Sequence, residues 1–130
     1  MARLYREAPL NAIWEGSGTV VALDVLRVLR RDRERAETMI GDLAQAGGAP
    51  GKAAAIVIKQ SLADQDCESH ARSIAEKLAR LAALAALHEA NGSLAEAYAA
   101  TRLQGAPHAT YGACDLRAVQ SQLLSRVLPG

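Results

Sequence analysis

The sequence predicts an all-α protein, an antiparallel bundle of about four or five helices. Apolar residues recur three and four positions apart over long segments, which is typical of amphipathic helices. No stretch of useful length alternates between apolar and polar residues, as a half-buried strand would. Hydrophobic residues make up 50% of the 130 positions and charged residues 22%, so the composition is that of a globular chain.

The core of this bundle has to be built from small and aliphatic side chains. The chain has no Phe, one Trp and three Tyr, so Leu, Ile, Val and Ala must fill the interior. Faces rich in alanine allow close approach of helices but bury little area each. We therefore expect a fold that is marginally stable or needs a partner surface.

The first helical segment is predicted over residues 19–46. Its arginine-rich middle is expected to be solvated. The GGAPG sequence at residues 47–51 ends the segment, and we expect it to form a solvent-exposed turn. The apolar residues on the predicted inner face are Val21, Val25, Val28 and Leu29.

A second segment begins near Lys52. The DQD sequence at 64–66 is either a short break or part of one long helix, and the pattern does not distinguish the two. From about residue 67 to residue 90 a further apolar stripe has helical spacing. The members of this stripe are Ile74, Leu78, Leu81, Ala85 and His88.

The sequence after this stripe contains residues that typically end one helix and begin another. Gly92 is predicted to end the helix in the left-handed conformation. Ser93 and Glu96 form a capping-box pattern for a following helix that ends near Leu103. A loop follows, and Asp115 is predicted to cap a last helix. Its apolar residues are Leu116, Val119, Leu123 and Leu124.

Charge and cysteine content exclude some classes of function. The formal net charge is +1, which gives no global attraction to nucleic acid or membrane. Cys67 and Cys114 are far apart, and neither belongs to a CxxC pair. The expected context is therefore reducing and cytoplasmic. No signal peptide or apolar run of membrane length is present in the sequence.

Two groups of residues have ordinary structural interpretations. Arg27 and Arg31 share a helix face and could meet phosphates, but a solvated face with local ion pairs fits the same pattern. The three histidines lack partners at metal-ligand spacing, so no metal site is predicted. They are His70, His88 and His108.

The WEGSG sequence at residues 14–18 contains a tryptophan, an acid and two glycines, whereas the start of a helix requires only one capping residue. Beside Trp14, Glu15 can sit in an apolar pocket, where desolvation would raise its pKa and suit it to accept a proton. The two glycines would let a flat or phosphate-bearing ligand approach the backbone. Ser17 and Thr19 offer hydroxyls at a helix start that favours anions. Taken alone, the pattern is weak and fits an exposed glutamate beside a capped helix better.

Three short sequences carry a family resemblance: YREAP at 5–9, IWEGSG at 13–18 and LDVLR at 23–27. They resemble the last part of acyl-CoA dehydrogenases, and WEGSG is closest to the AidB-type branch associated with the response to DNA alkylation. The more usual sequence of the family at this position is Tyr-Glu-Gly-Thr. Thr19 departs from the branch, which usually has Asn there.

The resemblance implies that residues 1–130 are part of a C-terminal helical domain. The N-terminal helical domain and the middle β domain, which supply most of the flavin site and the acyl pocket, are absent from the sequence. We therefore expect the isolated chain neither to hold FAD tightly nor to oxidise an acyl-CoA thioester. Its partners would be the missing domains or a separate subunit. Because the family's helices normally cover the β domain or neighbouring subunits, the resemblance also implies an exposed apolar face and self-association, most simply as a dimer.

The resemblance also assigns roles to residues. The family's base, which removes the α-proton of an acyl-CoA, matches Glu15. The candidates for contact with FAD are Ile13, Trp14, Gly16, Ser17, Gly18, Thr19 and Leu23. Two alternatives remain: a nucleic-acid-binding module that uses Arg27, Arg31 and Arg102, or a helical oligomerisation domain without enzymatic activity.

Overall fold

The structure is a computed structural model that describes residues 18–104 and 117–127. Within those residues it contains only helices, with no strand, which confirms the predicted all-α class. They are α2 (Gly18–Arg31), α3 (Arg33–Ala46), α4 (Gly48–Ala63), α5 (Ala71–Ala90), α6 (Gly92–Arg102), the 3-10 helix η1 (Arg117–Val119) and α7 (Gln120–Val127).

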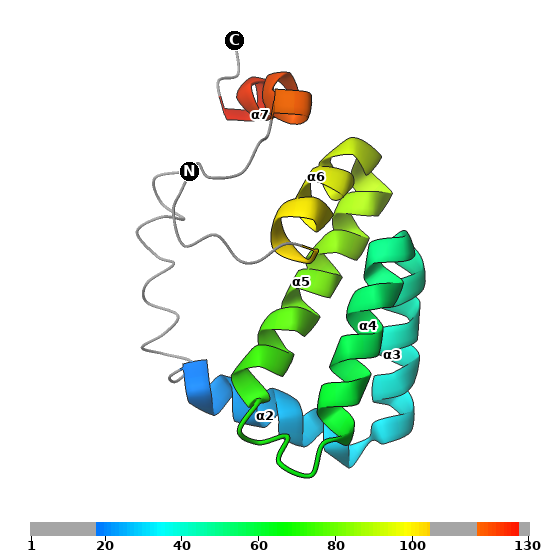
Figure 1. Ribbon diagram of the computed structural model, residues 1–130, viewed down its shortest axis with the longest axis vertical. Coiled ribbons are helices and arrows are strands. Elements are labelled where there is room, and N and C mark those ends of the chain that lie inside the picture. Colours follow the sequence, from blue (N-terminus) through cyan, green and yellow to red (C-terminus); the bar gives the residue numbers. More distant parts are fainter. Residues whose placement is uncertain (1–17, 105–116, 128–130) are drawn as a thin grey trace.

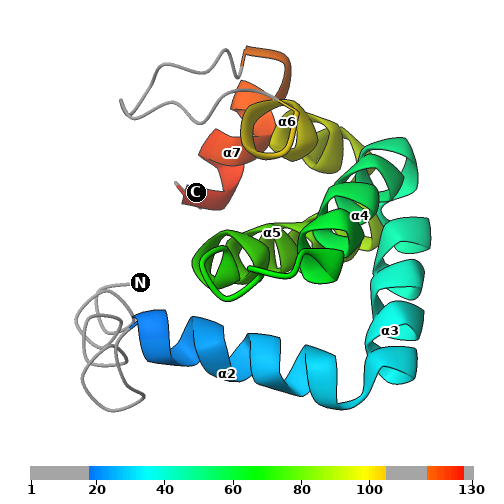
Figure 2. The same ribbon diagram turned by 60° about the horizontal axis from the view of Figure 1, so that its bottom comes forward.

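Helix α5 is the centre of the bundle. It packs against α2, α3, α4 and α6. The helices from α3 to α6 run alternately up and down, and α2 crosses the lower end of α5 (Figure 1). The view from below shows that α2 and α3 meet at a corner (Figure 2). This arrangement is the predicted antiparallel bundle, with α2 laid across one end.

The corner between α2 and α3 was not predicted. The expected single helix over residues 19–46 is interrupted at Asp32, whose backbone is non-helical with φ −128° and ψ 75°. The Asp32 side chain accepts a hydrogen bond from the Arg35 backbone N–H at 3.3 Å. A short polar side chain can cap a new helix in this way, so the chain ends one helix and starts another within a single residue.

The turn between α3 and α4 is tighter than predicted. Only Gly47 lies between the helices, and Gly48 has φ +66°, which favours glycine. Gly47 and Gly51 are buried, so the expectation of a solvent-exposed turn is wrong. A Cβ on Gly51 would lie 2.9 Å from the Ala44 carbonyl oxygen. The two helices approach this closely because no side chain stands between them.

The DQD sequence at residues 64–66, which the sequence pattern left undecided, lies in a break between two helices. Helix α4 ends at Ala63, and the Asp66 N–H donates to the Asp64 carboxylate at 3.0 Å in the following turn. Helix α5 begins at Ala71 rather than near residue 67. Cys67 lies in the turn and is 1% exposed, because it packs into the interior between α2 and α5.

Helix α5 contributes to all three clusters of the core. Most of its predicted stripe is buried or half-buried, but His88 is exposed. The first cluster joins α5 to α2, the second joins it to α3 and α4, and the third joins it to α6. The largest fully buried side chains are Ile40, Ile58, Ile74, Leu81 and Leu84.

The junction of α5 and α6 also differs from expectation. Asn91 has extended φ and ψ of −166° and 104°, and its side chain accepts from the Leu94 N–H at 3.2 Å. Gly92 is the first residue of α6 and not left-handed, so both the left-handed cap and the capping box starting at Ser93 are wrong. Asparagine is among the strongest N-cap residues, and here it outcompetes the serine two positions later.

The last predicted helix is present as η1 and α7. Val119 is buried and Leu123 is half-buried, whereas Leu124 is 49% exposed. The Gln122 side chain donates a hydrogen bond to the Ser93 hydroxyl at 3.0 Å and so connects α7 to the start of α6. The predicted cap Asp115 and the apolar Leu116 lie outside the described residues.

Candidate functional site

The predicted catalytic residue and most of its neighbours lie outside the described residues. These are Ile13, Trp14, Glu15, Gly16 and Ser17. The described structure begins with the helix that follows them. Of the predicted site, it therefore shows how α2 presents Gly18, Thr19 and Leu23.

The first turn of α2 is open to solvent. Gly18, Thr19 and Val20 are exposed, and no atom lies within 4 Å of the position a Cβ would take on Gly18. The first turn carries no acidic residue. The first backbone N–H groups of a helix have no intrahelical partner, and the helix dipole is positive at this end. A helix start of this kind favours a negatively charged group.

Leu23 takes a different position from Gly18 and Thr19. It is half-buried and packs against the cluster that joins α2 to α5. Together with Leu26 and Arg27 it also lines a hollow of about 260 Å³ that continues to Arg30 and Glu68. Leu23 therefore stabilises the packing of α2 against α5. Its exposed part adds apolar surface beside the first turn of α2.

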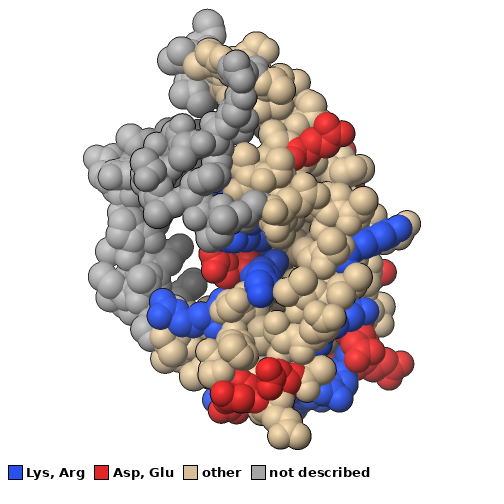
Figure 3. Space-filling view, viewed as in Figure 1, with Lys and Arg blue, Asp and Glu red and all other residues tan. Residues whose placement is uncertain are grey.

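The three candidate nucleic-acid residues are not shown to form one face. Arg27 forms an ion pair with Asp24 on its own helix, and both side chains are exposed. Arg31 is exposed one turn further along α2, whereas Arg102 lies near the end of α6. Acidic and basic side chains are interspersed over the described surface in the view of Figure 3. This mixture matches the solvated, locally paired surface considered above, and binding of nucleic acid stays a prediction.

No pattern in the sequence indicated the role of Arg80. Its guanidinium donates to the backbone carbonyl of Arg102 at 3.1 Å and also binds the Glu76 carboxylate. It thereby connects α5 to the last turn of α6, whose carbonyls lack intrahelical partners. The two arginines are 22 positions apart in the sequence, so no local pattern could have linked them.

Neither a metal site nor a membrane-spanning helix occurs within the described part of the chain. No group of three or more His, Cys, Asp or Glu side chains is arranged to hold a metal ion there. None of the described helices is long and apolar enough to cross a membrane.

Comparison with known proteins supports the resemblance for part of the chain. No family model matches. A stretch of 31 residues, 24% of this chain, is 64% identical to "Putative acyl-CoA dehydrogenase AidB" of Escherichia coli strain K12. The chain matches only 6% of the length of that relative. The AidB-type resemblance is thus confirmed for a fragment, and the activity of a whole protein is a matter for proposal.

Proposed function

We propose that this chain is the C-terminal helical part of an FAD-dependent acyl-CoA dehydrogenase-like oxidoreductase. The observation that carries the proposal is the 64% identity over 31 residues to an AidB-type protein. The all-α bundle is compatible with such a part, since the family's C-terminal domain is helical. The reaction would be the α,β-dehydrogenation of an acyl-CoA thioester.

Glu15 would act as the general base that removes the proton α to the thioester carbonyl. Trp14 would shield its carboxylate from water, which keeps the base in reach of the carbon and raises its pKa toward the working pH. When bound, FAD supplies the acceptor for the β-hydride. The free amides of the first α2 turn and the Thr19 hydroxyl would hold anionic and polar groups of the cofactor, and Leu23 would contact its apolar part.

The isolated chain is proposed to be inactive. A flavin site needs all of its contacts positioned at once, and the described residues of this chain would supply only a few of them. Purification of the 130-residue chain as a yellow protein with stoichiometric flavin would contradict this part of the proposal.

The decisive experiment uses the complete assembly, with this chain fused to or reconstituted with the missing domains. Glu15→Gln should slow flavin reduction by an acyl-CoA substrate by about 10²–10⁴-fold, the usual contribution of general-base catalysis, while FAD binding stays nearly intact. Rapid mixing measures the reduction, and a flavin-release assay measures retention. Equal reduction rates in the variant and the parent would exclude Glu15 as the base.

The matched variants are Ser17→Ala and Thr19→Ala. Each removes one hydroxyl, of Ser17 or of Thr19, without changing the proposed base. We expect both to weaken flavin retention more than the chemical step, the reverse of the Glu15→Gln pattern. Faster flavin release with an unchanged reduction rate in the retained fraction is the expected result.

Self-association is a second proposed property, and the outer surface of α2 supports it. Val20, Val21 and Val28 are 52%, 41% and 67% exposed on a helix whose opposite face is buried against α5. Exposed β-branched side chains in one region favour contact with another apolar surface, and we propose that a second copy of the chain supplies it. Sedimentation equilibrium should show dimers that the double substitution Val21→Ser and Val28→Ser weakens. A clean monomer of the parent at millimolar concentration would contradict the proposal.

A further inference from the structure

A hollow of about 160 Å³ lies where α2 turns into α3 and faces the last turns of α4. Leu29, Ala36 and Ile40 are buried, and Leu62 of α4 is half-buried beside them. The floor of the hollow is therefore aliphatic. A cavity of similar size, about 150 Å³, holds a benzene molecule in another protein, so this hollow has room for about six carbon atoms.

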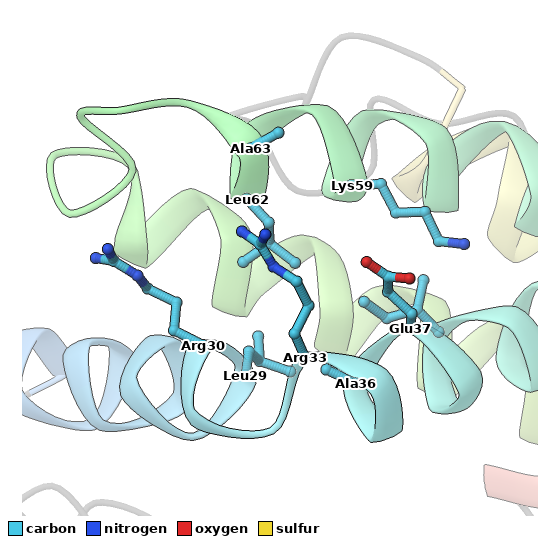
Figure 4. Close-up of a pocket in the computed structure, with 9 residues that line it drawn as sticks. Leu29, Arg30, Arg33, Ala36, Glu37, Lys59, Leu62 and Ala63 are labelled. Atoms are coloured by element: carbon cyan, nitrogen blue, oxygen red, sulfur yellow. The ribbon is translucent and has the colours of Figure 1, made fainter.

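The rim of the hollow is charged and mainly basic. Arg30, Arg33 and Lys59 line it together with one carboxylate, Glu37. Figure 4 shows Arg33 reaching from α3 toward Leu62 of α4, and Glu37 and Lys59 extending into the same space from facing helices. The rim thus carries three cations against one anion.

Two of these cations form no ion pair with the residues that the structure describes. Arg30 lies 3.6 Å from the Glu68 carboxylate. No salt bridge of Arg33 or Lys59 occurs among the residues that the structure describes. By contrast, Arg35, two positions further along α3, is paired with Asp32 at 3.3 Å. Arg33 of α3 and Lys59 of α4, which have no ion pair with described residues, thus flank the aliphatic floor.

We propose that this hollow binds a small anion with an aliphatic tail of about six carbons, whose carboxylate or phosphate head lies between Arg33 and Lys59. The tail displaces water from Leu29, Ile40 and Leu62, which favours binding because apolar surface is removed from water. A guanidinium and an ammonium together attract either head group, whereas a cationic head would be repelled. This binding site is separate from the proposed flavin edge at the start of α2 and does not depend on it.

The test is a titration of the 130-residue chain with hexanoate and with hexyl phosphate, followed by NMR. Methyl signals of Leu29, Ile40 and Leu62 should shift and saturate, with a dissociation constant on the order of millimolar for a ligand of this size. Acetate lacks the tail and hexylammonium inverts the charge, so neither should saturate these signals. Saturation by only one of the two hexyl anions identifies the preferred head group, and saturation by neither overturns the proposal.

Charge variants locate the head group. Arg33→Gln and Lys59→Gln should each weaken binding about fivefold, the scale of an exposed ion pair, and Glu37→Gln should strengthen it because a repelling carboxylate is removed. Arg35→Gln is the matched control, since it removes the same charge from the same helix outside the hollow. Circular dichroism confirms that each variant keeps its helices. Equal weakening by Arg35→Gln and Arg33→Gln would show only general charge attraction and overturn the proposal.

Discussion

Helix α4 and helix α2 both pack against neighbouring helices, but through different parts of the chain. Near the turn, the contact of α4 with α3 is made by backbone, because Gly47 and Gly51 let the two helices approach without an intervening side chain. The contact of α2 with α5 is made by side chains such as Leu26 and Ile74. A backbone contact has no rotamer that can adjust, so we expect the α3–α4 junction to tolerate change less well than α2.

The difference extends to the surfaces of the two regions. Ile40 and Ile58, at the centre of the α3–α4–α5 packing, are completely buried. Helix α2 buries Leu26 at 2% exposure, yet leaves Val28, two positions away, 67% exposed. The bundle around α5 is therefore closed on itself in this region, whereas α2 retains an apolar surface that a partner can use.

The largest expected effect on stability comes from the closed region. Leu81→Ala would leave a cavity among Ile40, Ala44, Ala55 and Ile58 and should lower the free energy of unfolding by about 2–5 kcal/mol. Urea unfolding of the two proteins measures the difference.

The control for that loss is on the open face of α2. Val28→Ala removes a side chain that is mostly in solvent, and alanine has the higher helix propensity. Its effect should stay within about 0.5 kcal/mol. Equal losses of unfolding free energy in Leu81→Ala and Val28→Ala would contradict the distinction between the closed region and α2.

The next effect tests the backbone contact between α3 and α4. Gly51→Ala places a Cβ 2.9 Å from the Ala44 carbonyl oxygen, so the helices must move apart. Such overpacking should cost about 1–3 kcal/mol. The thermal unfolding midpoint should fall accordingly.

Gly41 of α3 offers the matched control for this substitution. No atom lies within 4 Å of its would-be Cβ, and it is inside a helix. Gly41→Ala should therefore raise stability by up to about 1 kcal/mol. A loss at Gly41 as large as the loss at Gly51 would mean that close approach is not the cause.

The smallest expected effect concerns the start of α6. Asn91→Ala removes the acceptor for the Leu94 N–H and should cost about 1 kcal/mol. Ser93→Ala, at the position that the sequence pattern favours as the cap, should change stability by only a few tenths of that value. A larger loss at Ser93 than at Asn91 in chemical unfolding would restore the predicted capping box.

The sequence anticipated the helices better than their ends. Periodicity predicted the stripe of α5 through Ile74, Leu81 and Ala85, because helical spacing acts within a few residues. It did not predict the corner at Asp32, since the same local sequence is compatible with a solvated helix or with a cap. Of the candidate site, the described residues show the open first turn of α2, and the roles of Glu15 and its neighbours remain predictions.

By itself, the sequence determined that this chain is helical, that it breaks near Gly47, and that part of it is similar to an AidB-type protein. These properties depend on neighbouring residues and on their order. The tertiary structure decided that Gly51 and Cys67 are buried while Val28 is exposed, and that Arg33 and Lys59 share one hollow. Burial and the meeting of charges depend on segments far apart in the chain, and only packing brings those segments together.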